Sequence, residues 1–258
     1  MDEPTVTIRW PRGRLGWRNT PSDLQTLEVN STPRDSNDPE SEISVRSIDA
    51  VIFDFGGVLA SNGRPSDVVR RFPNDPADVV MRVMMGEYGQ DTDHPWHRLE
   101  RGEISMADYR SALAPLVMDA GLTPVATTFA PEPGQSIPFD FTPNAPVVEL
   151  VHELRDAGFR LGVLTNNVRE LRERWWPMLD FPRLFHDVVD SHEVGMRKPN
   201  PSIYRLALER LGVPAHRTAF LDDAESNVRA AIDVGLHGVL VDEDPTTAVS
   251  TVRLLANL

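Results

Sequence analysis

The chain has 258 residues, which is enough for one or two domains with a sizeable buried core. Acidic residues outnumber basic ones by 39 to 26, and the net charge of -13 argues against a nucleic-acid-binding surface, whose contacts begin with neutralising phosphates. Because cysteine is absent, disulfides, thiolate nucleophiles and thiolate-bound metals are excluded, so any metal must be bound by oxygen or imidazole.

The sequence also carries no sign of a membrane segment. No apolar run approaches the roughly 18 to 20 residues that cross a bilayer. Residues 1–30 lack the apolar stretch of a signal peptide. We therefore expect a cytoplasmic protein with neither membrane nor nucleic acid among its partners.

Residues 1–47 predict a disordered N-terminal extension. They are rich in Pro, Ser, Asn, Asp and Arg and show no helical or strand periodicity. Trp10 and Trp17 lie among arginines there, which leaves room for an unknown binding partner, although an unstructured tail is the simpler interpretation.

Short apolar runs predict the strands of a buried sheet. The first run covers 50–53 and is followed by Gly56 and Gly57. The later runs cover 161–164, 187–189, 218–221 and 238–241. Amphipathic helical patterns lie among them at 147–157, 202–211 and 224–234. Strands that alternate with helices predict a doubly wound, Rossmann-like α/β core with a parallel sheet.

The stretch between the first two strands is too long for a simple crossover. It contains helical patterns near 77–86 and 105–120, and Pro and Gly around 123–138 indicate an irregular return segment. We therefore predict an inserted, mainly α-helical cap domain at 63–145. The predicted core then comprises 48–62 and 146–258.

The residues that follow the predicted strands carry the candidate chemistry, because ligands of an open parallel sheet bind outside the carboxyl ends of its strands. These residues are Asp54, Gly56, Thr165, Asn166, Lys198, Asp222 and Asp223. Lys198 is the only lysine in the chain, which otherwise uses arginine for positive charge. Taken singly, Asp54 fits a turn, and Thr165-Asn166 and Asp223 fit helix caps. Together, three carboxylates repel one another unless a cation compensates them, and Mg²⁺ prefers oxygen ligands.

These residues lie in four motifs that resemble those of the haloacid dehalogenase (HAD) superfamily in order and spacing. The motifs are DFGGVL at 54–59, Thr165-Asn166, Lys198-Pro199, and FLDD at 220–223 followed by Asn227. The resemblance covers about 48–258. Within the insertion, WHRLERGEI at 96–104 is similar to the helical cap of the subgroup that includes the phosphatase domain of soluble epoxide hydrolases. The resemblance implies a Mg²⁺-dependent phosphatase of small phosphorylated metabolites.

The resemblance also implies a role for each motif residue. Asp54 is the implied nucleophile, which forms an aspartyl-phosphate that water then hydrolyses. The implied magnesium ligands are the Asp54 carboxylate, the Gly56 carbonyl oxygen, Asp223 and, directly or through water, Asp222. The implied phosphoryl-binding groups are Thr165, the Asn166 amide and Lys198.

One position departs from the family pattern. Most phosphatases of this family carry a general acid two residues after the nucleophile, where this chain has Gly56. Such an acid typically contributes about 10² to 10⁴-fold in rate. We therefore consider a substrate whose leaving group needs little protonation, an acid supplied by the cap from His94, His97 or Glu100, or an impaired enzyme, in that order.

Two rival functions remain open. One is a carbon-halogen hydrolase of the same family, which needs no metal. The Asp222-Asp223 pair argues against this function, because without a cation these acids would only raise the pKa of the carboxylate nucleophile. A protein that keeps the phosphate-binding groups for recognition or scaffolding fits the missing acid and the N-terminal extension. The effect of Asp54→Asn on turnover, as opposed to binding, distinguishes these alternatives.

Overall fold

The computed structural model describes residues 46–258 except 63–65, 70–71 and 124–140, and the described residues belong to one compact unit. Almost all of the predicted N-terminal extension, and most of the predicted return segment at 123–138, therefore lie outside the described residues. None of the described helices is long and apolar enough to cross a membrane.

A five-stranded, wholly parallel sheet forms the centre of the fold, in the order β3-β2-β1-β4-β5. The strands are β1 (Ala50–Phe53), β2 (Arg160–Thr165), β3 (Asp187–Asp190), β4 (Thr218–Asp222) and β5 (His237–Leu240). All four residues of β1 are buried, as expected for a central strand that is covered on both faces. The predicted fold class is confirmed, and each strand lies within one or two residues of its predicted position.

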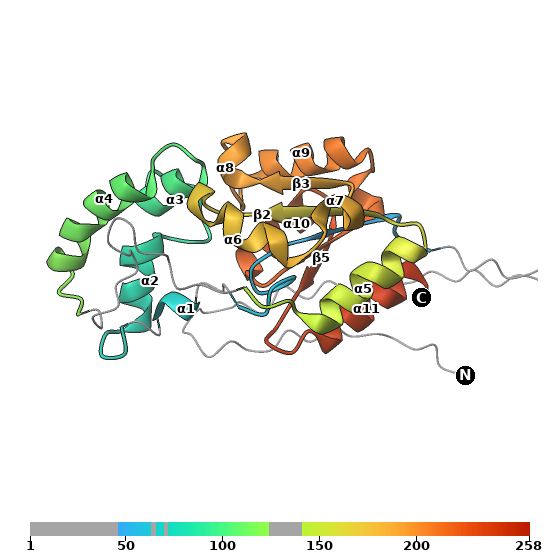
Figure 1. Ribbon diagram of the computed structural model, residues 1–258, viewed down its shortest axis with the longest axis horizontal. Coiled ribbons are helices and arrows are strands. Elements are labelled where there is room, and N and C mark those ends of the chain that lie inside the picture. The colour runs from blue at the N-terminus through green and yellow to red at the C-terminus, as the bar shows by residue number, and fades with distance from the viewer. Residues whose placement is uncertain (1–45, 63–65, 70–71, 124–140) are drawn as a thin grey trace, which may run out of the picture. The chain divides into compact units, whose positions relative to one another are not determined.

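Helices cover both faces of the sheet (Figure 1). On one face lie α5 (Ala145–Asp156), α11 (Thr246–Ala256), α6 (Arg172–Trp175) and α7 (Phe181–Leu184), whose apolar side chains share one core cluster with β1. On the other face lie α9 (Pro201–Leu211) and α10 (Glu225–Asp233), which pack with Ile52 and Phe220 in a second cluster. The remaining short elements of the core are α8 (Ser191–Val194) and the 3-10 turns Arg169–Leu171, Trp176–Met178 and Ala215–Arg217.

An inserted helical segment lies between β1 and β2. Its helices are α1 (Ser66–Val69), α2 (Ala77–Met85), α3 (Pro95–Glu100) and α4 (Met106–Asp119). They form a third apolar cluster, in which the Tyr109 hydroxyl donates a 2.7 Å hydrogen bond to the Met84 carbonyl. A capping box between Ser105 and Asp108 begins α4.

The inserted helices meet the core beside the carboxyl end of the sheet. A Cβ atom on Gly102, just after α3, would lie 2.4 Å from the carbonyl oxygen of His192 in α8, which directly follows β3. Val168 and Leu171, which follow β2, pack in the apolar cluster of the inserted helices. The insertion therefore lies next to the strand ends that carry the candidate residues.

Candidate active site

Three carboxylates converge where β1 and β4 end. The two strands pair in parallel register with Phe53 opposite Leu221, so Asp54 and Asp222 follow at adjacent positions. One carboxylate oxygen from each of Asp54, Asp222 and Asp223 lies within 4.8 Å of the others. Asp54 and Asp222 are buried, whereas Asp223 is half-buried.

The ammonium of Lys198 lies against this cluster. Its Nζ atom donates to Asp222 Oδ2 at 2.6 Å and to the Leu164 carbonyl at 2.9 Å, and lies 2.8 Å from Asp54 Oδ1. Only 1% of the side chain is exposed. Burial alone lowers the pKa of a lysine, but here the Asp222 and Asp54 carboxylates raise the pKa of Lys198 above its ordinary value, so the side chain stays charged.

Asn166 fixes the backbone of Lys198 from both sides. Its Oδ1 accepts the Lys198 backbone N–H at 2.8 Å, and its Nδ2 donates to the Lys198 carbonyl at 2.9 Å. The Lys198–Pro199 peptide bond is cis. Thr165, buried at the end of β2, lies between Asn166 and Leu164 in the chain. Asn166 and Lys198 are therefore brought together, with Thr165 next to Asn166 in the chain, and the side-chain amide of Asn166 positions Lys198.

Asp222 accepts hydrogen bonds at both of its carboxylate oxygens. Its Oδ1 accepts from the Ala224 backbone at 2.8 Å and from Asn227 Nδ2 at 3.1 Å. Its Oδ2 accepts from Lys198 and, at 3.2 Å, from Asn227. Because both oxygens already have protein donors, Asp222 is held to orient Lys198, which suits a carboxylate that reaches a metal through water.

Asp54 has a different environment. Its Oδ1 accepts the Phe55 backbone N–H at 2.7 Å. Burial raises the pKa of Asp54 to about 7, an effect that Lys198 reduces and Asp222 increases. Three clustered carboxylates beside a single ammonium carry excess negative charge, and their hard oxygen donors fit Mg²⁺. The donor set at this rim therefore suits the predicted cation.

Position 56 offers no side chain, and the three candidate acids of the insertion each have another role. The Glu100 carboxylate accepts a 2.6 Å hydrogen bond from Arg197. His94 Nδ1 accepts from the Trp96 backbone at 3.2 Å and stabilises the start of α3. His97 Nδ1 accepts from the Thr92 backbone at 3.1 Å, and burial lowers the pKa of His97 to about 3.

Arg197 is the residue that the sequence motifs did not single out. It directly precedes Lys198, is wholly buried and pairs with Glu100, which is 97 positions away in the chain. The one available signal was its position beside the only lysine, and no local pattern connects it to Glu100.

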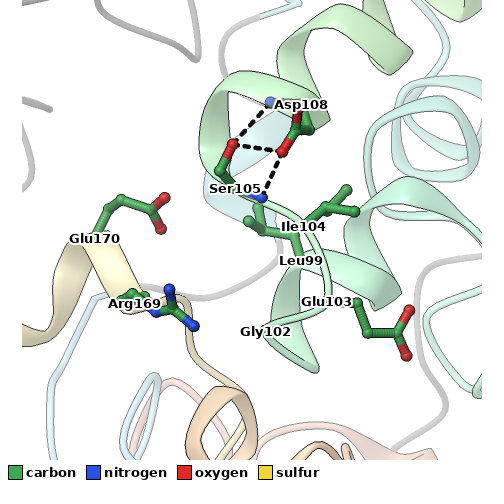
Figure 2. Close-up of a pocket in the computed structure, with 8 residues that line it drawn as sticks. All are labelled: Leu99, Gly102, Glu103, Ile104, Ser105, Asp108, Arg169 and Glu170. Atoms are coloured by element: carbon green, nitrogen blue, oxygen red, sulfur yellow. Dashed lines mark hydrogen bonds between the residues drawn. The ribbon is translucent and has the colours of Figure 1, made fainter.

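A cavity of about 160 Å³ lies at another junction of the insertion with the core (Figure 2). The turn from α3 to α4 lines one side, and Arg169 and Glu170 line the other. Glu170 Oε1 accepts the Met106 backbone N–H at 2.9 Å, which joins the two sides. The lining contains none of the candidate catalytic residues, so the cavity is separate from the carboxylate cluster.

A comparison with known protein families leads to the same family as the sequence motifs. The model of the haloacid dehalogenase-like hydrolases matches residues 48–235. The chain therefore belongs to the haloacid dehalogenase-like hydrolase family, and the family predicted from the four motifs is confirmed.

Individual relatives differ in how much of them the chain covers. Acyl-CoA dehydrogenase family member 10 of Mus musculus is 32% identical over 214 residues, which are 81% of this chain and 19% of that protein. Bifunctional epoxide hydrolase 2 of Rattus norvegicus is 32% identical over 104 residues, 38% of this chain and 18% of that protein. Phosphatase MT3486 of Mycobacterium tuberculosis is 30% identical over 225 residues, 82% of this chain and 95% of that protein. The chain thus spans less than a fifth of two of these relatives and nearly all of the third.

A solved structure shows the same fold. A HAD-like family hydrolase from Porphyromonas gingivalis superimposes with a TM-score of 0.55 and 25% sequence identity. The match covers 81% of this chain and 98% of that chain, so it includes most of the described α/β core.

Proposed function

We propose that this protein is a Mg²⁺-dependent phosphatase of small phosphorylated metabolites that acts through an aspartyl-phosphate on Asp54. The observation that supports this proposal most strongly is the convergence of Asp54, Asp222 and Asp223 with the buried ammonium of Lys198. A relative named as a phosphatase, of which the chain covers 95%, points in the same direction.

In the proposed reaction, a carboxylate oxygen of Asp54 attacks phosphorus while the bond from phosphorus to the leaving oxygen breaks. Water then attacks the phosphorus of the aspartyl-phosphate, which releases inorganic phosphate and restores Asp54. Lys198, Thr165 and the backbone N–H of Asn166 would bind the phosphoryl oxygens and stabilise their charge. Lys198 can do so because Leu164 and Asp222 already fix the direction of its ammonium.

The proposed ligands of Mg²⁺ are Asp54, the Gly56 carbonyl oxygen and Asp223, with Asp222 contributing through water. When bound, the ion would supply the positive charge that lets an anionic substrate approach an anionic carboxylate. The three carboxylates supply oxygen donors of the kind that Mg²⁺ prefers.

Gly56 narrows the proposed substrates. Because this position cannot protonate a leaving group, we expect a preference for phosphorylated compounds with stable leaving groups, such as an anomeric sugar phosphate or a diphosphate. The engagement of Glu100 with Arg197 and the low pKa of His97 support this alternative over an acid supplied from the insertion.

We further propose that the inserted segment, 63–145, acts as a cap that selects the substrate. Its packing beside the ends of β2 and β3 supports this role. A cytoplasmic location, the absence of nucleic-acid and membrane partners and a possible partner for residues 1–47 remain part of the proposal.

The test is phosphate release from an aryl phosphate and a panel of phosphorylated metabolites, with and without Mg²⁺. Turnover that needs Mg²⁺ and disappears in Asp54→Asn would support the proposal. Halide release from a haloacid without added metal would favour the dehalogenase alternative. Binding of phosphorylated compounds without turnover, unchanged in Asp54→Asn, would favour recognition.

A further inference from the structure

Arg197 is a buried cation whose described side-chain hydrogen bonds all lead to the inserted segment. Its Nε donates to Glu100 Oε2 in α3 at 2.6 Å. Its Nη1 donates to the Gln90 carbonyl, and its Nη2 lies 3.5 Å from the Tyr88 carbonyl. The side chains of Arg197 and Glu100 are 0% and 2% exposed, so the pair is shielded from solvent.

The acceptors other than Glu100 lie in one short stretch, Gly86–Asp91, which we call the closing segment. It directly follows α2 in the connection to α3, whereas Arg197 lies in the core between α8 and α9. The guanidinium carbon also lies 5.4 Å from the ring centroid of Tyr88, within the range of a cation-π contact. One core side chain thus holds the closing segment through its backbone and an aromatic ring.

Other core residues also contact the closing segment. Asn200 Nδ2 donates to Asp91 Oδ2 at 3.2 Å. A Cβ atom on Gly89 would lie 3.2 Å from Cβ of Ser226 in α10, three residues after Asp223. The closing segment therefore packs against the start of the helix that follows the catalytic carboxylates.

The electrostatics of Tyr88 agree with this placement. Burial, followed by the charge of Glu100, raises the pKa of Tyr88 well above its ordinary value, and Asp54 and Asp222 add to the increase. The hydroxyl of Tyr88 therefore stays protonated, and it lies close enough to Asp54 and Asp222 for their charges to affect its pKa.

We infer that Arg197 is a positioning residue that clamps the closing segment over the phosphate site, while the next residue, Lys198, binds the phosphoryl group. This inference rests on the proposed phosphatase function. The two neighbours act in opposite directions, since Lys198 contacts Asp54 and Asp222 in the core and Arg197 contacts Glu100 in the insertion. Arginine is suited to the clamp because its planar fork offers several donors in fixed directions, which lysine cannot reproduce.

Three variants separate the clamp from damage to the fold. Arg197→Lys keeps the charge and loses the fork, and Glu100→Gln keeps the shape and loses the charge. The double variant Arg197→Met/Glu100→Met removes both charges, so it leaves no unpaired buried charge to unfold the protein. The matched control is Arg98→Met, because Arg98 lies on α3 with its side chain 45% exposed and pairs with Glu103 on the surface.

Amide hydrogen exchange of the full chain tests the clamp without reference to activity. We expect exchange at residues 86–91 to accelerate about tenfold or more in Arg197→Lys and in the double variant. Exchange in β1 and β4 should stay unchanged, and Arg98→Met should match the wild type. Glu100→Gln should have a smaller effect, because its amide oxygen can still accept from Arg197.

Kinetics at saturating Mg²⁺ provide the second measurement. We expect kcat/KM for the best substrate of the panel to fall about tenfold or more in Arg197→Lys and in the double variant. The inhibition constant of inorganic phosphate should change by less than about threefold. Phosphate would contact Lys198, Thr165 and Asn166, whereas the described side-chain hydrogen bonds of Arg197 go to Glu100, Gln90 and Tyr88.

The inference is overturned if exchange at 86–91 is unchanged in both Arg197→Lys and the double variant. It is also overturned if phosphate inhibition weakens in parallel with kcat/KM, because Arg197 would then act on the core site itself. A wild type that turns over no phosphorylated compound would contradict the proposed function alone, since the exchange measurement still decides the role of Arg197.

Discussion

The absence of a side chain at position 56 can be tested by adding one. Gly56→Asp places a carboxyl group two residues after Asp54, where the family resemblance implies a general acid. The backbone can accept it, because Gly57 has a φ of 76° whereas Gly56 lies outside the left-handed region. Gly56 is half-buried. Replacing a glycine in an allowed conformation also removes about 0.4 to 1 kcal/mol of chain entropy from the unfolded state, so we expect the variant to fold.

The size of the effect should depend on the leaving group. A general acid contributes about 10² to 10⁴-fold, which corresponds to about 2.7 to 5.4 kcal/mol of activation free energy. An alkyl phosphate releases a strongly basic alkoxide and should gain most of this factor. An aryl phosphate releases a stable phenolate and should gain little. We therefore expect the alkyl-to-aryl ratio of kcat/KM to rise about 100-fold or more in Gly56→Asp.

The assay compares kcat/KM for one alkyl and one aryl phosphate at saturating Mg²⁺. Gly56→Asn is the matched control, because it has the same size as aspartate but cannot donate a carboxylic proton. If Gly56→Asp folds and its alkyl-to-aryl ratio equals that of the wild type or of Gly56→Asn, the missing acid does not limit the reaction and the argument from Gly56 is refuted.

Further predictions concern the ammonium, the metal and the buried histidine. Lys198→Met should lower kcat/KM about 10² to 10³-fold in steady-state kinetics, because it removes a phosphoryl-binding charge. Asp223→Asn should raise the Mg²⁺ concentration needed for half-maximal activity. Asp156→Asn should not, because Asp156 is exposed at the end of α5, near the amino end of β2. His97 has a folded-state pKa of about 3 and an ordinary unfolded value near 6.5. Below about pH 6.5 the unfolded state therefore binds a proton at His97 that the folded state does not bind. Denaturant titrations should show stability falling in that range, by at most about 1.4 kcal/mol per pH unit from this group, and less steeply in His97→Gln.

Each of these has an outcome that would contradict it. An unchanged kcat/KM in Lys198→Met would show that Lys198 does not bind the phosphoryl group. Equal Mg²⁺ dependence in Asp223→Asn and the wild type would show that Asp223 is not a ligand of the metal. Identical pH dependence in His97→Gln would show that His97 does not stay neutral in the fold, where Arg197 and His94 disfavour its charge and Asp91 favours it.

Much of the core follows from the sequence because its strands are buried on both faces. A central parallel strand needs apolar residues at every position, and the AVIF run of β1 has no other simple interpretation. The parallel arrangement then brings the residues that follow β1 and β4 to one rim, which is why Asp54 and Asp222 were predicted to meet. Lys198 was predicted to join them because it is the only lysine in the chain and follows the third predicted strand.

Other parts depend on packing that local patterns do not reveal. Helix α11 was not predicted, because its sequence, TTAVSTVRLLA, is rich in β-branched residues with modest helix propensity. Burial of Val249 and Val252 in the same cluster as α5 stabilises it instead. The Arg197–Glu100 pair was missed for a similar reason, since its partners are distant in the chain and meet only in the folded protein.

The most direct test of the central claim is phosphate release by the wild type and Asp54→Asn, each with and without Mg²⁺. Asp54→Asn retains the size of the side chain and removes the nucleophilic charge. We predict turnover in the wild type with Mg²⁺ and none in the other three conditions. Turnover by Asp54→Asn at the wild-type rate, or wild-type turnover that does not depend on Mg²⁺, would contradict the claim that Asp54 forms an aspartyl-phosphate at a magnesium site.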